Sequence, residues 1–94
     1  MNKEKRIREA IKIEIDSANL RLANTGNRGK TTPGFVNGDS HEEFSSHSCE
    51  LCNSSLAGER YGVNLIFPGT DIEHIEYSVC VDCYYFVAYG ELPL

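Results

Sequence analysis

The pairs Cys49-Glu50-Leu51-Cys52 and Cys80-Val81-Asp82-Cys83, which 27 residues separate, decide how this chain folds. Two residues between paired cysteines allow a tight turn that directs both sulfur atoms at one point. Two such turns can place four thiolates around one Zn²⁺ ion, with Zn–S distances of about 2.3 Å. The spacing therefore predicts a zinc site with four ligands: Cys49, Cys52, Cys80 and Cys83.

Four thiolate ligands complete the coordination of the ion and leave no position for water or a substrate. The predicted role of the metal is therefore structural. Iron–sulfur ligation and two disulfides are the alternatives. A thioredoxin-type redox pair would need one C-x-x-C in a larger α/β frame, so it is not expected.

The length of the chain, 94 residues, allows one domain. Apolar residues make up 40% of the sequence and Trp is absent, so the core must be small. A chain this short buries only about 60% of its unfolded surface and often needs a cross-link or a metal. This disfavours an enzyme with a large cofactor domain. The short apolar runs exclude a transmembrane helix, which needs about 20 residues.

Charge is distributed unevenly along the chain. Residues 1–30 contain eight of the nine basic side chains and four acidic ones, a net charge of +4. Residues 31–94 contain one base, Arg60, and ten acids, a net charge of −9. This asymmetry indicates either a charged interaction surface or two solvated faces that keep the protein in solution.

The start of the chain carries charged residues through Arg8 and has no apolar segment of roughly 7–15 residues, so no secretory signal is expected. We therefore expect a cytoplasmic protein. In a reducing cytoplasm, paired cysteines bind metals more often than they form disulfides, which favours the zinc interpretation.

Residues 1–23 are predicted to form an amphipathic basic helix. Apolar side chains recur at steps of three and four along one face, as in a helix that packs on a core: Ile7, Ile11, Ile15, Ala18 and Leu22. Ile13 and Leu20 fall near the opposite face, seven residues apart. We expect either a second apolar face, which allows a homodimer through Ile13 and Leu20, or a helix with two exposed apolar residues.

Residues 24–48 are predicted to be a linker. Turn-forming residues interrupt this segment three times, at 24–27, 32–34 and 37–39. Its large apolar residues are expected to hold it against the rest of the chain: Phe35, Val36 and Phe44. A connection of this length is either functional or partly mobile.

Residues 49–94 are predicted to form a four-cysteine zinc module. Apolar residues alternate over 61–67 and again over 75–79, with a turn at 68–71 between them, which predicts a β-hairpin. The apolar run that follows the second cysteine pair predicts a short buried helix over about 81–89.

The two cysteine pairs differ in their local settings. The first pair lies on a loop, where Asn53 is expected to take the left-handed conformation that the turn requires. The second pair follows a strand and opens the short helix, whose N-terminal amides favour thiolates and whose dipole suits Asp82. Gly90 is expected to end this helix.

The predicted fold class is a small α+β zinc-stabilised domain. An N-terminal helix precedes a zinc knuckle, a β-hairpin and a short helix. Over about 49–89 this order resembles the treble-clef zinc-finger pattern. A zinc ribbon, in which the second cysteine pair lies on another knuckle, is the alternative fold.

Three other motifs are considered and not favoured. The stretch 24–31 comes close to a phosphate-binding loop, but Asn24 stands where Gly is required and the stretch follows a helix. His74 lies between the cysteine pairs, yet an HNH-type nuclease needs further ligands around a second metal. His47 lies two residues before Cys49 and could bind a metal or a thiolate, but four cysteines already complete the site.

The second half of the chain looks like small uncharacterised zinc-finger proteins of phages, prophages and plasmids. The resemblance rests on three stretches, 44–61, 79–84 and 88–93, which hold both cysteine pairs and their surroundings. It implies zinc binding and a bacterial host cytoplasm, and it implies no activity. The N-terminal helix lies outside it.

These observations lead us to expect a non-enzymatic zinc-binding module that interacts with another protein, such as a phage-type inhibitor or modulator of a host nucleic-acid-associated protein. The alternative is a nucleic-acid-binding zinc-finger protein that uses the basic N-terminal helix, through Lys3, Lys5, Arg6 and Arg8. An enzyme with an unrecognised site is a third hypothesis, weakened by the closed thiolate site.

Overall fold

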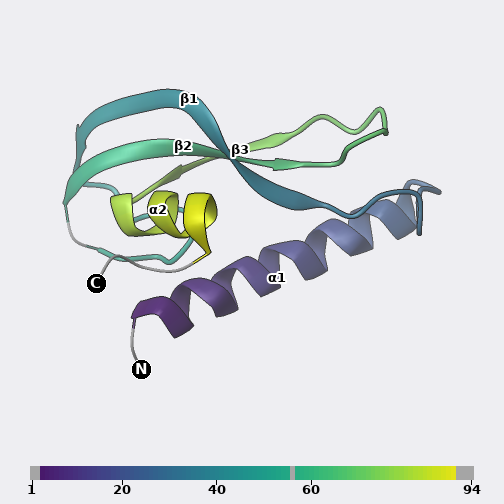
Figure 1. Ribbon diagram of the computed structural model, residues 1–94, viewed down its shortest axis with the longest axis horizontal. Helices are drawn as coiled ribbons and strands as arrows, with labels where there is room; N and C mark the ends of the chain where they lie inside the picture. Colours follow the sequence, from purple (N-terminus) through teal and green to yellow (C-terminus); the bar gives the residue numbers. More distant parts are fainter. Residues whose placement is uncertain (1–2, 56, 91–94) are drawn as a thin grey trace.

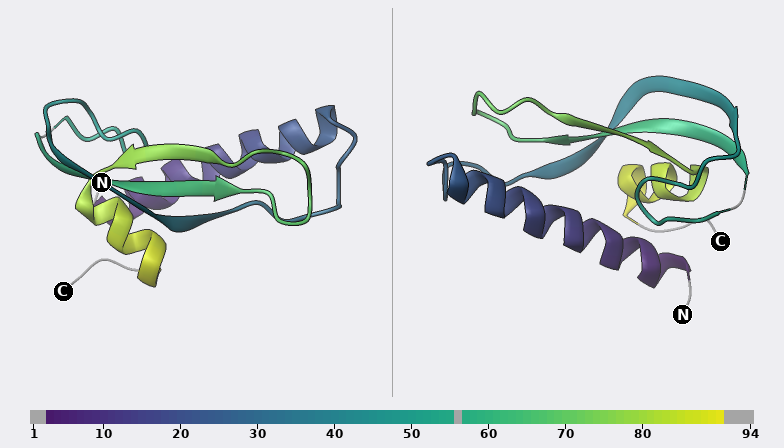
Figure 2. Two further views of the ribbon diagram at one scale, coloured as in Figure 1. Left: turned by 90° about the horizontal axis from the view of Figure 1, so that it is seen from above. Right: turned by 180° about the vertical axis from the view of Figure 1, so that it is seen from behind.

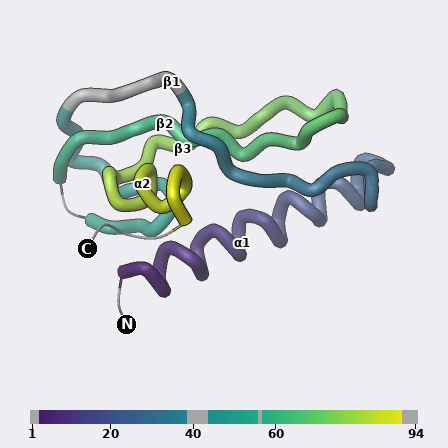
Figure 3. The backbone as a smooth tube through the Cα atoms, viewed as in Figure 1, coloured from purple at the N-terminus to yellow at the C-terminus, as the bar shows by residue number. Residues whose placement is uncertain are grey.

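A computed structural model describes residues 3–55 and 57–90, and the side chains of 39–43 lie outside this description (Figure 3). The chain forms two helices and three strands, in the order α1 (Lys3–Asn24), β1 (Gly34–Ser45), β2 (Gly58–Ile66), β3 (Ile75–Val79) and α2 (Val81–Tyr89). The strands make one antiparallel sheet in the order β1-β2-β3. The fold is therefore small and α+β, as predicted.

The sheet curves over the two helices. Figure 1 shows β1 and β2 arching over α2, while α1 runs beneath α2 and on toward the tip of the β2–β3 hairpin. Figure 2 shows the same arrangement from above and from behind. One long helix therefore reaches both the α2 end and the hairpin end of the molecule. Within the described residues, the helices are too short or too polar to cross a membrane.

The predicted apolar stripe of α1 is confirmed. Ile7, Ala18 and Leu22 are buried, and Ile11 and Ile15 are partly buried against the core. Two further apolar residues of this helix, Ile13 and Leu20, are each 64% exposed on its outward side. The helix ends where the amides of Thr25 and Asn27 bond to the carbonyls of Arg21 and Leu22.

The structure differs from the sequence prediction in residues 24–48. These were predicted to be a linker, but 34–45 form β1, which pairs along β2. A Cβ atom at Gly38 would lie 3.3 Å from the carbonyl oxygen of Gly62, so glycine allows the two strands to approach closely there. In the sequence this glycine indicates a turn, and two register shifts, between residues 37 and 41 and between 42 and 44, hide the alternation of a strand.

Only one of the three apolar anchors expected in this segment, Phe35, is partly buried and packs against the core. Phe35 contacts both buried clusters of the protein and meets the ring of Tyr77 edge-on at 5.4 Å between centroids. Val36 is 40% exposed, and Phe44 is 71% exposed. The prediction that all three hold the segment in place was therefore wrong for Val36 and Phe44.

The predicted hairpin and short helix are confirmed. β2 and β3 pair directly, with Val63 opposite Tyr77 and Leu65 opposite Ile75. α2 ends at Gly90, which has a φ of 76° and whose amide bonds to the carbonyl of Phe86. Glycine suits this left-handed position because it has no Cβ atom.

The buried residues form two cores. The metal-end core contains all four cysteines and the apolar residues around them: Ile7, Leu51, Val63, Val79 and Phe86. The hairpin-end core is smaller and contains Ala18, Leu22, Leu65 and Phe67. α1 contributes to both, because Ile7 lies near its start and Leu22 near its end.

Candidate metal centre

The four cysteine sulfur atoms lie within 4.8 Å of one another, and all four residues are buried. The Sγ atoms of Cys49 and Cys83 are 3.7 Å apart, as are those of Cys52 and Cys80. A tetrahedron with Zn–S bonds of about 2.3 Å has S···S edges of about 3.8 Å. A disulfide would bring two sulfurs to about 2.05 Å. The four cysteines are therefore free thiols at a spacing that could hold a metal ion.

The first cysteine pair lies on a tight loop. The amide of Asn53 bonds to the carbonyl of Cys49, and the amide of Cys49 bonds to the carbonyl of Ser54. Asn53 has a φ of 64°, the left-handed conformation predicted for it. The amide of Leu51 points at the Cys49 sulfur, 3.4 Å away. This loop therefore supplies both thiols and one backbone donor to the site.

The second cysteine pair begins α2. Cys80 occupies the N-cap position, and its amide points at the Cys49 sulfur at 3.3 Å. The amide of Tyr84 bonds to the Cys80 carbonyl in the first turn, which leaves Cys83 facing inward with no exposed surface. A helix N-terminus stabilises negative charge, so this position favours thiolates.

Two contacts that the sequence did not indicate join the first loop to the sheet. The backbone and side chain of Glu50 both bond to Ser78 on β3, at 3.0 and 2.6 Å. The guanidinium of Arg60 on β2 donates to the carbonyls of His47 and Glu59, and this residue is only 2% exposed. The signal in the sequence that could have indicated a special role for Arg60 is that it is the one basic residue in an otherwise acidic stretch. Together these contacts fix the loop against the strand that leads to the second pair.

The thiols share charge among themselves. Hydrogen bonds with Cys80 and Cys83 hold the pKa of the Cys49 thiol well below its usual range. The hydrogen bond with Cys49 raises the pKa of Cys80 to about 11 and also raises the pKa of Cys83. Among these three thiols, deprotonation is therefore favoured at Cys49 over Cys80 and Cys83. A cation that binds all four sulfurs has to displace those protons, so its affinity falls as pH falls.

The start of α1 covers one side of the cluster. Ile7 has no exposed surface and packs in the same core as the cysteines. The Nζ atom of Lys3 lies 3.1 Å from the Asp82 carboxylate. Burial alone would lower the pKa of Lys3, but the hydrogen bond with Asp82 and the charges of Cys80 and Cys52 raise it. The Arg8 guanidinium lies over the Phe86 ring at 5.2 Å. The helix thus places both apolar and basic groups beside the thiols.

The other candidate residues from the sequence analysis do not lie in this metal site. Among the described His, Cys, Asp and Glu residues, the group close enough to hold a metal consists of the four cysteines. His47 and His74 are both exposed. Of the four basic residues of the nucleic-acid hypothesis, Lys3 and Arg8 contact α2, while Lys5 and Arg6 are exposed.

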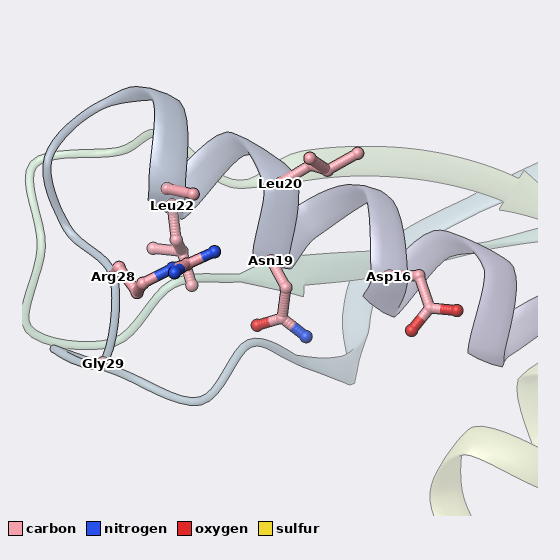
Figure 4. A pocket seen from close by; sticks show the side chains of 7 residues that line it. Asp16, Asn19, Leu20, Leu22, Arg28 and Gly29 are labelled. Carbon is pink, nitrogen blue, oxygen red and sulfur yellow. The ribbon is translucent and has the colours of Figure 1, made fainter.

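A hollow of about 340 Å³ lies at the far end of α1, beside the turn that follows the helix. Figure 4 shows Arg28 and Gly29 of that turn near Asn19 and Leu22 of the helix. The hollow contains none of the cysteines. The adjacent helix end presents carbonyls, so its dipole disfavours phosphate. This agrees with the sequence argument against a phosphate-binding loop.

No protein-family model, curated protein or solved structure matches this chain. Its function therefore has to be inferred from the thiol cluster and the residues around it. The resemblance of residues 44–61, 79–84 and 88–93 to phage-type zinc-finger proteins therefore stays a prediction.

Proposed function

We propose that the chain is a zinc-stabilised, non-enzymatic protein-interaction module. The observation that carries the metal part of the proposal is the set of four buried thiols with S···S separations of 3.7 Å. Four thiolates saturate Zn²⁺ in structural sites, and such sites contribute directly to folding. The ion would then fix the loop of the first pair to the start of α2.

The order of elements supports the treble-clef version of this proposal. A loop with the first cysteine pair precedes the β2–β3 hairpin, and the second pair opens α2. In a zinc ribbon the second pair would lie on another knuckle. Here Cys80 is the N-cap of a nine-residue helix and Cys83 is in its first turn.

Metal analysis of the purified protein tests the zinc proposal. We expect one zinc per chain, and a cobalt-substituted form with the visible spectrum of tetrahedral thiolate coordination. Absence of metal, or the absorption of an iron–sulfur cluster, would show that the proposal is wrong. A water ligand in the coordination sphere would remove the non-enzymatic part of it.

Charge and apolar exposure support the interaction part of the proposal. Zn²⁺ with four thiolates adds a net charge of −2 to a segment that already carries −9. Such a surface favours a basic protein partner over nucleic acid. Ile13 and Leu20, both on the outward side of α1, supply an apolar stripe for a second copy or another protein. The phage resemblance adds a host nucleic-acid-associated protein, in a bacterial cytoplasm, as the partner class to test.

Sedimentation and affinity capture test this part. We expect the double substitution Ile13→Ser with Leu20→Ser to abolish self-association or the capture of one defined partner without changing the zinc content. Asn19→Ser, on the exposed surface of the same helix, is the matched control. A strictly monomeric parent at high concentration would remove the homodimer, and capture unaffected by the double substitution would remove this face as the docking surface.

Nucleic-acid binding through α1 has less support. Lys3 pairs with Asp82, and Arg8 pairs with Glu4 and covers the Phe86 ring. Lys3 and Arg8 therefore already have intramolecular partners that a nucleic acid would have to replace. Binding that rises steeply as salt is lowered, and that is lost when Lys5 and Arg6 are neutralised, would revive it.

A further inference from the structure

We propose that the first two turns of α1 form a lid on the metal centre, in which Ile7 and Lys3 control how readily the bound ion is exchanged. This inference rests on the proposed zinc binding. It assigns to α1 a role that the cysteine pattern does not contain, because the zinc module was predicted to begin at residue 49.

The apolar part of the lid is Ile7. Its side chain has no exposed surface and belongs to the core cluster that contains all four cysteines. Phe86 of α2 belongs to the same cluster, and the Arg8 guanidinium covers its ring. Figures 1 and 2 show this part of α1 lying beside α2, with the other half of the helix reaching away under the hairpin.

The polar part of the lid is Lys3, which lies beside the most exposed of the four cysteines. Cys80 is 9% exposed, the most exposed of the four cysteines, and it lines a cavity of about 350 Å³. Lys3 and Asp82 line the same cavity and form an ion pair of 3.1 Å at this side of the site. A competing ligand that enters this cavity therefore comes into contact with the lysine as well as with Cys80.

The physical reason for a coupling is twofold. Exchange of an ion from a closed thiolate site requires one sulfur to leave and a new ligand to reach the metal, so a side chain packed in the core that holds the four cysteines slows both steps. A positive charge beside a centre of net charge −2 also favours the loaded state. By linkage, the metal then stabilises the docked helix as much as the docked helix stabilises the metal.

The first experiment compares two buried residues of the same helix. Ile7 and Leu22 are 0% and 2% exposed, but Ile7 packs in the metal-end core and Leu22 in the hairpin-end core. The readout is the rate at which bound zinc passes to an excess of a colorimetric chelator. We expect Ile7→Ala to speed the transfer about tenfold, because it opens a cavity beside the sulfurs, and Leu22→Ala to leave it within about twofold. Equal acceleration by both substitutions would show that α1 acts only through overall stability.

The second experiment uses surface residues, so it does not depend on whether Ile7→Ala folds. Lys3 and Lys12 each lie within 4.0 Å of an aspartate, but only Lys3 is beside the thiols. We expect Lys3→Gln to speed zinc transfer about two- to fivefold, the range of one exposed ion pair, and Lys12→Gln to leave it unchanged. A Lys3→Gln protein that exchanges zinc at the parent rate would overturn the lid.

The two proposals fail in different ways. A parent protein that binds no zinc removes the proposed function and the lid together. A parent that binds one zinc, together with a Lys3→Gln protein that exchanges its zinc at the parent rate, removes the lid alone.

Discussion

The two cores of this protein lie at opposite ends of α1 and differ in what stabilises them. The metal-end core gathers four thiols, with backbone amides directed at one sulfur, around a few apolar side chains. The hairpin-end core has four apolar residues and no sulfur. We therefore expect the stability of the first core to depend on metal supply and pH, and that of the second to depend on apolar burial alone. One helix that joins both allows their separate contributions to be measured in one chain.

The largest effect is expected from Cys83→Ser, which removes one of the four thiols. Binding of structural zinc contributes about 10–16 kcal/mol in small zinc domains, so its loss exceeds the stability of a chain this size. We expect the protein to lose its zinc and α2 to lose its protection from hydrogen exchange. Zinc analysis, circular dichroism and hydrogen exchange measure these changes.

Val81→Ser is the matched control for Cys83→Ser, because Val81 lies between Cys80 and Cys83 and is 54% exposed. It should keep one zinc per chain. If Cys83→Ser retains the melting temperature of the parent, the metal site is dispensable and the distinction between the two cores disappears.

The next effect is expected from Leu22→Ala in the hairpin-end core. Leu22 is 2% exposed, and truncation of a buried leucine costs about 2–5 kcal/mol. We expect the free energy of unfolding to fall by about 3 kcal/mol while the zinc content stays at one per chain. Urea unfolding with parallel zinc analysis measures both quantities. If the Leu22→Ala protein is fully folded but has lost its zinc, the two cores are not independent of each other.

A smaller effect is expected from Tyr77→Phe. The Tyr77 hydroxyl donates to a carboxylate oxygen of Glu14 at 2.8 Å and so links β3 to α1. Loss of this bond should cost about 1 kcal/mol near neutral pH. Burial and the bond to Glu14 raise the pKa of Tyr77 above its ordinary value.

The pH dependence of this contribution has a definite sign. A group whose pKa is raised in the folded state stabilises the fold fully below its unfolded pKa, which is about 10 for tyrosine, and loses that effect as pH rises through the folded value. The difference in unfolding free energy between parent and Tyr77→Phe should therefore be constant from pH 7 to 9 and shrink above pH 10. Urea titrations of both proteins across this range test it, and a gap that widens above pH 10 would contradict the assignment.

The smallest effect is expected at Asn53, in the loop of the first cysteine pair. Its φ of 64° is costly for most side chains, tolerated by asparagine and free of cost for glycine. Asn53→Ala should lower the free energy of unfolding by about 0.5–1 kcal/mol, and Asn53→Gly should leave it nearly unchanged. Thermal melts of the zinc-loaded proteins compare the two, and equal losses would point to a side-chain role for Asn53 instead.

Much of the fold could be predicted from the sequence because its signals are local. The alternation of apolar residues in the hairpin, the left-handed Asn53 and the start of α2 at the second cysteine pair depend on neighbours within a few residues. The candidate metal ligands follow from their spacing, and the structure brings the four sulfurs together.

The parts that could not be predicted depend on distant contacts. β1 is a strand because it pairs with β2, and Gly38, which permits that pairing, is a turn signal when read alone. Ile7 and Lys3 reach residues of the metal end that lie more than 40 positions away in the sequence. An apolar face on a helix predicts that the helix packs against the core, but it does not predict which residues that face contacts.

The buried position of Arg60 has a consequence for how the molecule meets others. It is the only lysine or arginine between residues 31 and 94, and it is 2% exposed. Among the side chains that the structure describes in that stretch, the exposed carboxylates therefore belong to a segment with no exposed lysine or arginine of its own, while α1 carries most of the positive charge. Such a charge separation acts as a permanent dipole, which turns the molecule during a diffusional encounter before any contact forms.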